Sequence, residues 1–389
     1  MIRLIRAACL LAAIAGASLG TAAPAGASQT TALHVAAIGA PQRVHGSDGR
    51  EHIDYDLVIT NNFTAEVTLT SLVVRGGGTK LLTLEGDALA VATHQTTGLG
   101  EPTRSIPPSS AVTTLVDVVL PRSAGRSVPK QLRHRITYTF PPGAPGEAII
   151  GSKTVDAPKL RVDRREPIEV APPVRGDGWL SANACCDPSV NHRSTLLSAN
   201  GTYVAPETFA VDYIRVVNGR FYDGDGTQNT DWFAYGAPIR AVAGGKVVSV
   251  VNDRPEVPPL AELNNPTVTK PSDFGGNGVV IEIRPGVFAH YFHMQTGSVS
   301  VEVGQRVRTG QKLGLLGNSG NTSGPHLHFG ITDGRDTLTT NSLPFEIDRF
   351  RFEGTADPGS TPGELTVTGK PHNERRSHPL LTSISDYSR

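Results

Sequence analysis

Cysteine, unbalanced charge and long apolar runs are all scarce in this sequence. Only 3 of its 389 residues are cysteine, so an apolar core, and not a disulfide framework, must hold the fold. The chain has 36 basic and 36 acidic residues, which gives a formal net charge of zero. Because it carries no basic surplus, we predict that it has no nucleic-acid partner. The length predicts two domains plus tails.

The one marked apolar run lies at the N-terminus. "MIRLIRAA" contributes two arginines, "CLLAAIAGASLG" is short and apolar, and "AGA" at 25–27 is a small-residue cleavage site. We expect residues 1–27 to be a secretory signal peptide that is cut after Ala27, with a retained membrane anchor as the alternative. Cys9 stands at the start of the apolar run and does not follow it, which argues against a lipoprotein. No other run is long enough to span a membrane, so we expect secretion without stable membrane insertion.

The other two cysteines are adjacent, Cys185 and Cys186 in "NACCDPS". An exported protein meets oxidising conditions, but adjacent cysteines can close only a strained ring. A vicinal disulfide, two free thiols and an intermolecular bridge all remain open at this point.

Residues 28–160 read as short alternating runs such as "HIDYDLVIT" and "EVTLTSLVV", separated by turn residues. This spacing predicts an antiparallel, β-sandwich-like domain. The region has no cluster of metal-ligand residues, and we interpret its scattered histidines as surface or pairing residues and the domain as a binding or spacer module. These histidines are His34, His45, His52, His94 and His134.

Proline and charge in 161–178 predict a linker, and strand signals with "GG" and "RPG" turns return in 179–353. The fold class we predict is therefore all-β, a β-sandwich-like domain followed by an antiparallel sheet or barrel-like domain. The proline-rich stretch 252–276 is expected to be an exposed loop near the mouth of any cleft. Residues 354–389 are polar and predict a loosely ordered tail, in which His372 and His378 are solvated.

The stretch "SGPHLHFGI" places His326 and His328 on either side of one leucine. In a strand, residues two apart point to the same face and lie about 6.5 Å apart, while Leu327 and Phe329 point to the opposite, apolar side. Two imidazoles on one face suit a metal, or a metal ligand beside a proton carrier.

Further candidate residues lie upstream of this pair. Asp212 sits in the apolar run "FAVDYI", where a buried carboxylate requires a cation nearby. "FAHYFHM" contains His290 and His293, and His192 lies in "NHRS". We expect His290 to face away from the cleft.

Four segments then resemble one known family in the same order. "VGQRVRTGQKLGLLGNSGNTSGPHLHFGI" resembles the C-terminal signature of the lysostaphin or LytM-type zinc metallopeptidases, and "YGAPIRAVAGGKVVSVV", "FAHYFHM" and "AVD" resemble earlier segments. The resemblance covers about residues 190–335. It implies a peptidase domain of the duplicated hybrid motif type, with one Zn²⁺ per chain. Its implied partners are the peptide stems or cross-links of peptidoglycan, and its implied location is extracellular and cell-wall associated.

The resemblance also implies a role for each matching residue. His328 corresponds to a zinc ligand and Asp212 to a second one. His326 and His293 correspond to the two catalytic histidines beside the attacking water.

At one position the sequence departs from the family pattern. The family carries a histidine four residues before the aspartate, where this chain has Thr208, a poor zinc ligand. "ANGT" can turn a hairpin that brings residues 190–196 beside 208–214, and we therefore propose His192 as the third ligand. A surface histidine without a metal role is the alternative, and Cys185 or Cys186 as a thiolate ligand is another.

These residues predict a secreted, zinc-dependent endopeptidase that hydrolyses peptide bonds in peptidoglycan. One alternative is a catalytically inactive domain that binds the wall or regulates other wall hydrolases, which Thr208 keeps open. A second is a cysteine hydrolase built from Cys186 and His192, which the adjacent cysteine disfavours.

Overall fold

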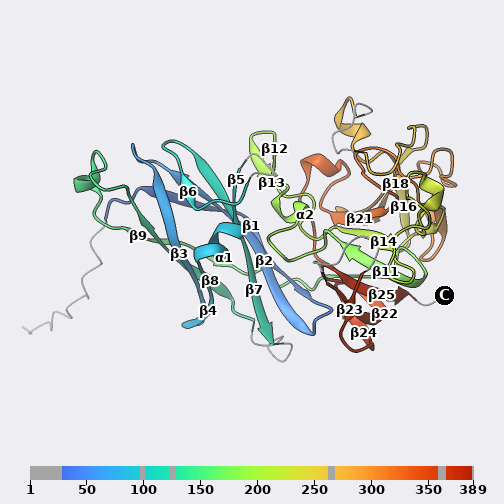
Figure 1. Ribbon diagram of the computed structural model, residues 1–389, viewed down its shortest axis with the longest axis horizontal. Helices are drawn as coiled ribbons and strands as arrows, with labels where there is room; N and C mark the ends of the chain where they lie inside the picture. Colours follow the sequence, from blue (N-terminus) through green and yellow to red (C-terminus); the bar gives the residue numbers. More distant parts are fainter. Residues whose placement is uncertain (1–28, 97–100, 122–127, 262–267, 358–364, 388–389) are drawn as a thin grey trace, which may run out of the picture.

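The computed structural model describes residues 29–96, 101–121, 128–261, 268–357 and 365–387. The expected signal peptide, residues 1–27, lies outside this part of the chain. None of the helices in the described ranges has the length and apolar character needed to cross a membrane. Two β domains lie side by side, and the predicted all-β class is confirmed (Figure 1).

The first domain consists of two antiparallel sheets and a short helix, α1 (Gly86–Val91). One sheet has the order β1-β2-β7-β5 and the other β4-β3-β8-β9, with β6 paired to β3. The strands are β1 (Leu33–His45), β2 (Arg50–Asn61), β3 (Val67–Gly76), β4 (Thr79–Glu85), β5 (Thr93–Gln95), β6 (Ser105–Ile106), β7 (Ala111–Pro121), β8 (Gln131–Thr139) and β9 (Thr154–Arg161).

Alternation along the strands explains why these two sheets pack together. In β8 every second residue is buried, from Leu132 to Tyr138, while the residues between them are exposed or half-buried. The apolar faces of both sheets meet in one core. The predicted β-sandwich-like domain is therefore confirmed.

The second domain is dominated by one large sheet in the order β10-β22-β25-β11-β14-β21-β18-β17-β16-β19, with β23 and β24 paired to β22. All of these pairings are antiparallel except β10 with β22. The strands are β10 (Ile168–Val170), β11 (Gly176–Ala182), β14 (Val211–Arg215), β16 (Gly245–Val251), β17 (Asn277–Arg284), β18 (Val287–Met294), β19 (Arg306–Val307), β21 (Leu327–Thr332), β22 (Phe345–Ala356), β23 (Val367–Thr368), β24 (His372–Ser377) and β25 (Ser383–Tyr387).

Smaller elements surround this sheet. β12 and β13 form a hairpin, and β15 and β20, which are distant in the sequence, form a second two-stranded sheet. Their bounds, with those of the short helix α2, are β12 (Leu197–Ala199), β13 (Thr202–Val204), β15 (Pro238–Arg240), β20 (Lys312–Leu315) and α2 (Asn191–Ser194).

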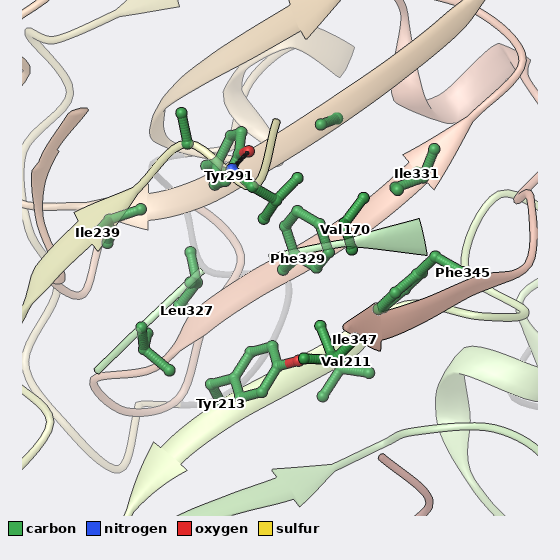
Figure 2. Close-up of a cluster of buried hydrophobic side chains, with 14 of the residues drawn as sticks. Val170, Val211, Tyr213, Ile239, Tyr291, Leu327, Phe329, Ile331, Phe345 and Ile347 are labelled. Carbon is green, nitrogen blue, oxygen red and sulfur yellow. Dashed lines mark hydrogen bonds between the residues drawn. The ribbon is translucent and has the colours of Figure 1, made fainter. Parts of the chain in front are cut away.

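The central strands of the large sheet have one apolar face. Leu327, Phe329 and Ile331 of β21 are fully buried and pack with Tyr291 of β18 and Val211 of β14 (Figure 2). Because side chains alternate along a strand, the residue between Leu327 and Phe329 points to the opposite face. The core thus holds the strands whose other face carries the candidate site.

Two expected boundaries differ from the structure. The stretch 161–178, expected to be a linker, contains β10 and the start of β11, because Ile168 and Val170 are apolar enough to pack into the second core. The expected polar tail from residue 354 is also wrong. β22 continues to Ala356, and β24 and β25 pair with β22, so the second domain extends to Tyr387.

The sequence predicts a polar tail here because the strands of this segment bury few hydrophobic residues. β25 buries Ile384 and Tyr387, whereas β24 exposes most of its charged residues. His378 is fully buried and its Nδ1 donates to the Phe345 carbonyl oxygen (3.0 Å), in contrast to the solvated residue expected. His372 is exposed and pairs with Glu374 (2.8 Å).

Candidate active site

The site begins with a cross-strand pair at the centre of the large sheet. Asp212 of β14 lies directly opposite His328 of β21, and Nδ1 of His328 is 3.0 Å from Oδ1 of Asp212. Opposite residues of an antiparallel pair share a face, so the register places this carboxylate and this imidazole together. Both residues are buried.

Two further side chains reach Asp212 from the segment between β11 and β12. Nε2 of His192 lies 3.3 Å from Oδ2 of Asp212, and Nδ1 of His192 is 3.3 Å from the Ala210 carbonyl oxygen. The amide of Asn183 donates to the same Oδ2 (2.8 Å). The chain reaches this position through the β12–β13 hairpin, which turns at Asn200–Gly201. Nothing in the sequence spacing singled out Asn183.

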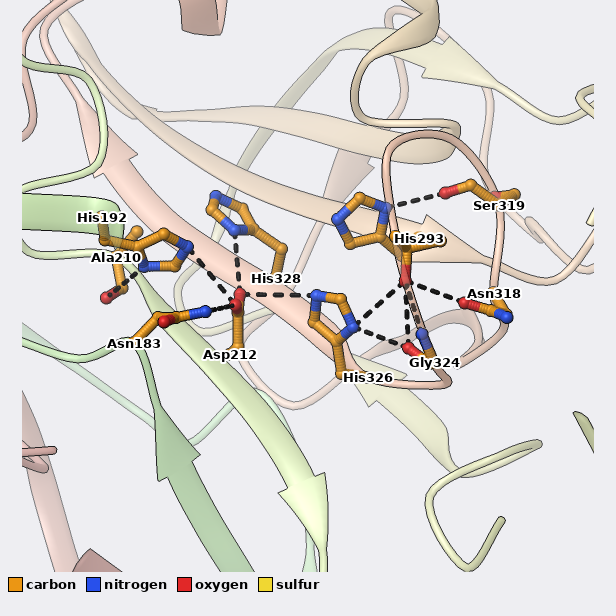
Figure 3. A network of polar contacts seen from close by, with 11 residues as sticks. Asn183, His192, Ala210, Asp212, His293, Asn318, Ser319, Gly324, His326 and His328 are labelled. Atoms are coloured by element: carbon orange, nitrogen blue, oxygen red, sulfur yellow. Dashed lines mark hydrogen bonds and ion pairs between the residues drawn. The ribbon is translucent and has the colours of Figure 1, made fainter. Parts of the chain in front are cut away.

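The donor atoms of His192, Asp212 and His328 lie within 4.8 Å of one another (Figure 3). Two imidazole nitrogens and one carboxylate oxygen are the ligand types that zinc takes in catalytic sites, with a fourth position left for water or substrate. The Ala210 carbonyl and the Asn183 amide supply the outer hydrogen bonds that orient such ligands. The three residues therefore fit a single zinc ion.

A second pair of histidines adjoins this cluster. The ring centroids of His293 and His326 are 4.6 Å apart, and Nε2 of His326 is 3.5 Å from Oδ1 of Asp212. Nδ1 of His293 donates to the Ser319 carbonyl oxygen (2.7 Å), and Nδ1 of His326 donates to that of Gly324 (2.8 Å). A neutral imidazole that donates through Nδ1 keeps a lone pair on Nε2. Each ring is thus prepared to accept a proton at Nε2.

His293 reaches the site because its backbone departs from the extended conformation within β18. Its φ angle is +62°, in the left-handed region that few residues other than glycine adopt. Its N–H donates to Gly275 and its carbonyl accepts from Gly317, which fixes this turn of the chain. His290, expected to face away, lies on the same sheet face as Phe292 and His328, because Phe292 is opposite His328 in the register. It binds Thr332 and Thr337 and does not line the cavity.

Four of these side chains divide into a charged pair, Asp212 and His192, and a neutral pair, His293 and His326. Burial would raise the pKa of Asp212, but His192 and His326 hold it well below its usual range. Burial opposes the charge of His192, yet Asp212 raises its pKa to about 9. Burial and the neighbouring His326 lower the pKa of His293 well below its usual value, and burial also lowers that of His326 against the effect of Asp212. At neutral pH His293 and His326 are therefore neutral.

The remaining alternatives for the third ligand are less well placed. The hydroxyl of Thr208 lies 3.5 Å from the Ala205 carbonyl oxygen, with which it pairs. Cys185 and Cys186 form a disulfide, and Sγ of Cys185 is directed at Asp54 of β2 (3.9 Å). The structure therefore leaves neither sulfur as a free thiol, which removes the premise of both the thiolate ligand and the cysteine nucleophile.

Comparison with known proteins adds the family. The family model "Peptidase family M23" matches residues 227–340. This part of the chain is similar to peptidase family M23. The expected resemblance to lysostaphin and LytM-type enzymes is thereby confirmed.

Two curated relatives and one solved structure illustrate the range of similarity of the chain to known proteins. The peptidoglycan DD-endopeptidase ShyB of Vibrio cholerae is 33% identical over 117 residues, which are 30% of this chain and 22% of that protein. The glycyl-glycine endopeptidase ALE-1 of Staphylococcus capitis is 31% identical over 108 residues, 28% of this chain and 25% of that protein. The catalytic domain of lysostaphin from Staphylococcus simulans is 22% identical, with 38% and 80% of the two chains covered and a TM-score of 0.23. The chain thus spans a quarter or less of the length of these two curated relatives.

The match to the M23 family covers only part of the site. His293, His326 and His328 lie inside the matched residues, whereas Asp212 and His192 precede them. Residues of the matched range 227–340 and residues that precede it together line one cavity of about 630 Å³. All five side chains of the candidate site are part of this lining. Its walls include Trp232 and Phe274, the latter from the loop 252–276 that was expected near a cleft.

Proposed function

We propose that this protein is a secreted, cell-wall-associated zinc endopeptidase that hydrolyses peptide bonds in bacterial peptidoglycan. The observation that carries this proposal is the convergence of His192, Asp212 and His328 on one buried point, with His293 and His326 beside it in the same cavity. The match of residues 227–340 to peptidase family M23 supports peptide-bond hydrolysis as the reaction.

In this proposal His192, Asp212 and His328 hold one zinc ion. When bound, zinc supplies a Lewis acid that lowers the pKa of water and polarises a carbonyl group. Nε2 of His293 or His326 takes the proton of the attacking water, because both rings are neutral and fixed through Nδ1. With this proton the ring is an imidazolium, which stabilises the oxyanion that develops on the scissile carbonyl and then gives the proton to the leaving amine nitrogen.

The substrate class follows from the cavity and from the relatives. The cavity lining combines apolar surfaces, among them Leu197, Trp232 and Phe274, with polar groups such as Asn183 and Asn321. A groove of this kind accepts a peptide segment and orients it by a few hydrogen bonds. ShyB and ALE-1 are named as endopeptidases of peptidoglycan and of glycyl-glycine bonds, which favours a peptide stem or cross-link here.

The first test combines metal content with hydrolysis. The purified chain should hold one zinc by elemental analysis, and it should release soluble fragments with new amino termini from isolated peptidoglycan. His328→Ala should lose both zinc and hydrolysis, since it removes a ligand. Thr208→Ala is the matched control, because the Thr208 hydroxyl pairs with Ala205, and it should keep both.

The competing reading is an inactive domain that binds the wall or regulates other wall hydrolases. A chain that binds zinc and peptidoglycan but generates no new amino termini would support that reading and reject the proposed hydrolysis. Hydrolysis retained in His328→Ala would reject the zinc mechanism.

A further inference from the structure

The segment that carries His192 lies between the two domains. Residues 183–196, here called the ligand loop, contain the four-residue helix α2 and no strand (Figure 1). The ligand loop is therefore not part of any sheet, and a helix of one turn is not stable by itself. A metal ligand must nevertheless be held close to its productive position, so something else must fix the loop.

Arg193, the neighbour of His192, supplies such a fixed point. Its side chain is completely buried, and its Nη2 lies 2.8 Å from Oδ1 of Asp54 and 3.0 Å from Oδ1 of Asp56. Both aspartates belong to β2 of the first domain and, two residues apart, they share a face of that strand. While His192 points to Asp212, Arg193 thus points to the other domain.

Two more contacts join the ligand loop to the first domain. Sγ of Cys185 lies 3.9 Å from Oδ2 of Asp54, and Nε2 of His94 lies 3.3 Å from the Pro188 carbonyl oxygen. The loop is therefore attached to the first domain at its beginning, middle and end, while its contacts to Asp212 come from Asn183 and His192.

We propose that Arg193, clamped by Asp54 and Asp56, is the positioning residue for His192, so that the first domain completes the metal site of the second. This inference rests on the proposed function, because it requires His192 to be a zinc ligand. It gives the first domain a role beyond the binding or spacer function expected from its sequence. A buried charged pair holds its partners in one arrangement, because a displaced guanidinium would leave an unpaired charge inside the protein.

Metal affinity of the full chain tests the clamp. Arg193→Lys keeps the charge but removes the Nη2 group that contacts both aspartates, and Asp56→Asn removes the carboxylate of one of these two partners. We expect the zinc Kd, measured by competition with a chromophoric chelator, to rise about 10- to 100-fold in Arg193→Lys and less in Asp56→Asn. The visible spectrum of the cobalt-substituted protein should also change, because the coordination by His192 changes.

The matched control is Glu346→Gln. Glu346 is another buried carboxylate at the domain interface, where it accepts a hydrogen bond from the backbone N–H of His45 (3.0 Å), and it does not touch the ligand loop. Its replacement should leave the zinc Kd and the cobalt spectrum unchanged. An equal effect of Glu346→Gln and Arg193→Lys would mean that general weakening of the interface, and not the clamp, sets the affinity.

The outcomes separate this inference from the proposed function. Wild-type protein without zinc would reject the proposed function itself. Folded Arg193→Lys and Asp56→Asn proteins with wild-type zinc Kd and cobalt spectrum would overturn the clamp while leaving the function in place. If neither variant folds, hydrogen exchange of the wild type decides: zinc should slow exchange in β2 more than in β3, and equal exchange with and without zinc would overturn the clamp.

Discussion

At the scale of single residues, the candidate site contains two groups with different proposed roles: residues that bind a metal and residues that accept a proton. His326 donates through Nδ1 to the Gly324 carbonyl and presents Nε2 to the cluster. We predict that His326→Ala keeps one zinc per chain and lowers kcat by about a hundredfold or more, the usual cost of one stabilising group. Zinc analysis and steady-state hydrolysis of a defined peptide measure both quantities.

His290→Gln is the control for this prediction. His290 belongs to the same strand as His293 but lies outside the cavity lining, so its replacement should leave kcat within a few-fold of the wild type. Loss of zinc in His326→Ala would instead identify His326 as a ligand and require a different division of roles.

Buried histidines outside the site predict a stability that changes with pH on both sides of about 6.5. Burial lowers the pKa of His134 to about 4, so as pH falls from 6.5 to 4 the unfolded chain gains a proton that the folded chain does not bind, and stability falls. Burial opposes the charge of His52, but Asp117 and Asp48 raise its pKa to about 10. Between pH 6.5 and 10 the folded chain keeps a proton that the unfolded chain has lost, so stability falls as pH rises.

Urea unfolding at about pH 5, 6.5 and 9 measures this dependence. His134→Gln should reduce the loss on the acid side, and Asp117→Asn should reduce the loss on the basic side, because it removes a partner of His52. A midpoint that does not change between pH 5 and 6.5 in the wild type would contradict the assignment of His134 as a buried neutral residue.

Residue-level prediction from the sequence succeeded where strand alternation decides the outcome. The spacing of His326 and His328 predicted one shared face, and the apolar residues beside them predicted the core face that is observed. Asn183 could not be found in this way, since it reaches Asp212 across 29 positions through an irregular loop. The orientation of His293 also escaped prediction, because it depends on one left-handed residue.

At the scale of elements, β25 shows how a polar sequence can still be part of a core. Tyr387 is almost fully buried, and its ring contacts Tyr213 at a centroid distance of 5.9 Å and Phe350 at 5.8 Å. We predict that Tyr387→Ala destabilises the folded chain by about 3–5 kcal/mol, the range for deletion of a buried aromatic ring. Chemical denaturation of the full chain measures this loss.

Asn373→Ala on the neighbouring strand β24 is the control, since Asn373 is exposed and its replacement should change stability by less than about 0.5 kcal/mol. Equal stability of Tyr387→Ala and the wild type would instead support the loosely ordered tail that the sequence predicted. The sequence misled because hydrophobic composition averaged over 354–389 hides the two buried hydrophobic side chains of a five-residue strand, Ile384 and Tyr387.

The hairpin β12–β13 is the element that the sequence did place well. Asn-Gly between two short extended runs is a strong local turn signal, and the observed pairing of Ala199 with Thr202 encloses Asn200 and Gly201. The domain contact that holds the ligand loop had no such local signal. Arg193 and Asp54 are 139 positions apart, and only the tertiary fold brings them together.

At the scale of the whole molecule, the domain interface contains buried polar contacts at several separate places. Besides the Arg193 clamp, the backbone N–H of His45 donates to Glu346, and Ser47 and His378 form a backbone hydrogen bond (3.0 Å). If the domains separated, these polar groups would lose their partners. Those that stayed buried would be unpaired, and those that became exposed would lose the contacts that they make in the interface. The two domains are therefore expected to depend on each other for stability.

We predict that the full chain unfolds in one calorimetric transition, with equal calorimetric and van't Hoff enthalpies, because loss of either domain removes the partners of Arg193 or of Asp54 and Asp56. Zinc at a hundredfold excess over its Kd should stabilise that single transition by about 2.7 kcal/mol, since it binds only the folded state. Two transitions, of which zinc moves only one, would show instead that the first domain folds independently of the metal site. Arg193→Lys provides the internal comparison: with the clamp weakened, the transition should broaden or divide, and the shift caused by the same zinc concentration should become smaller.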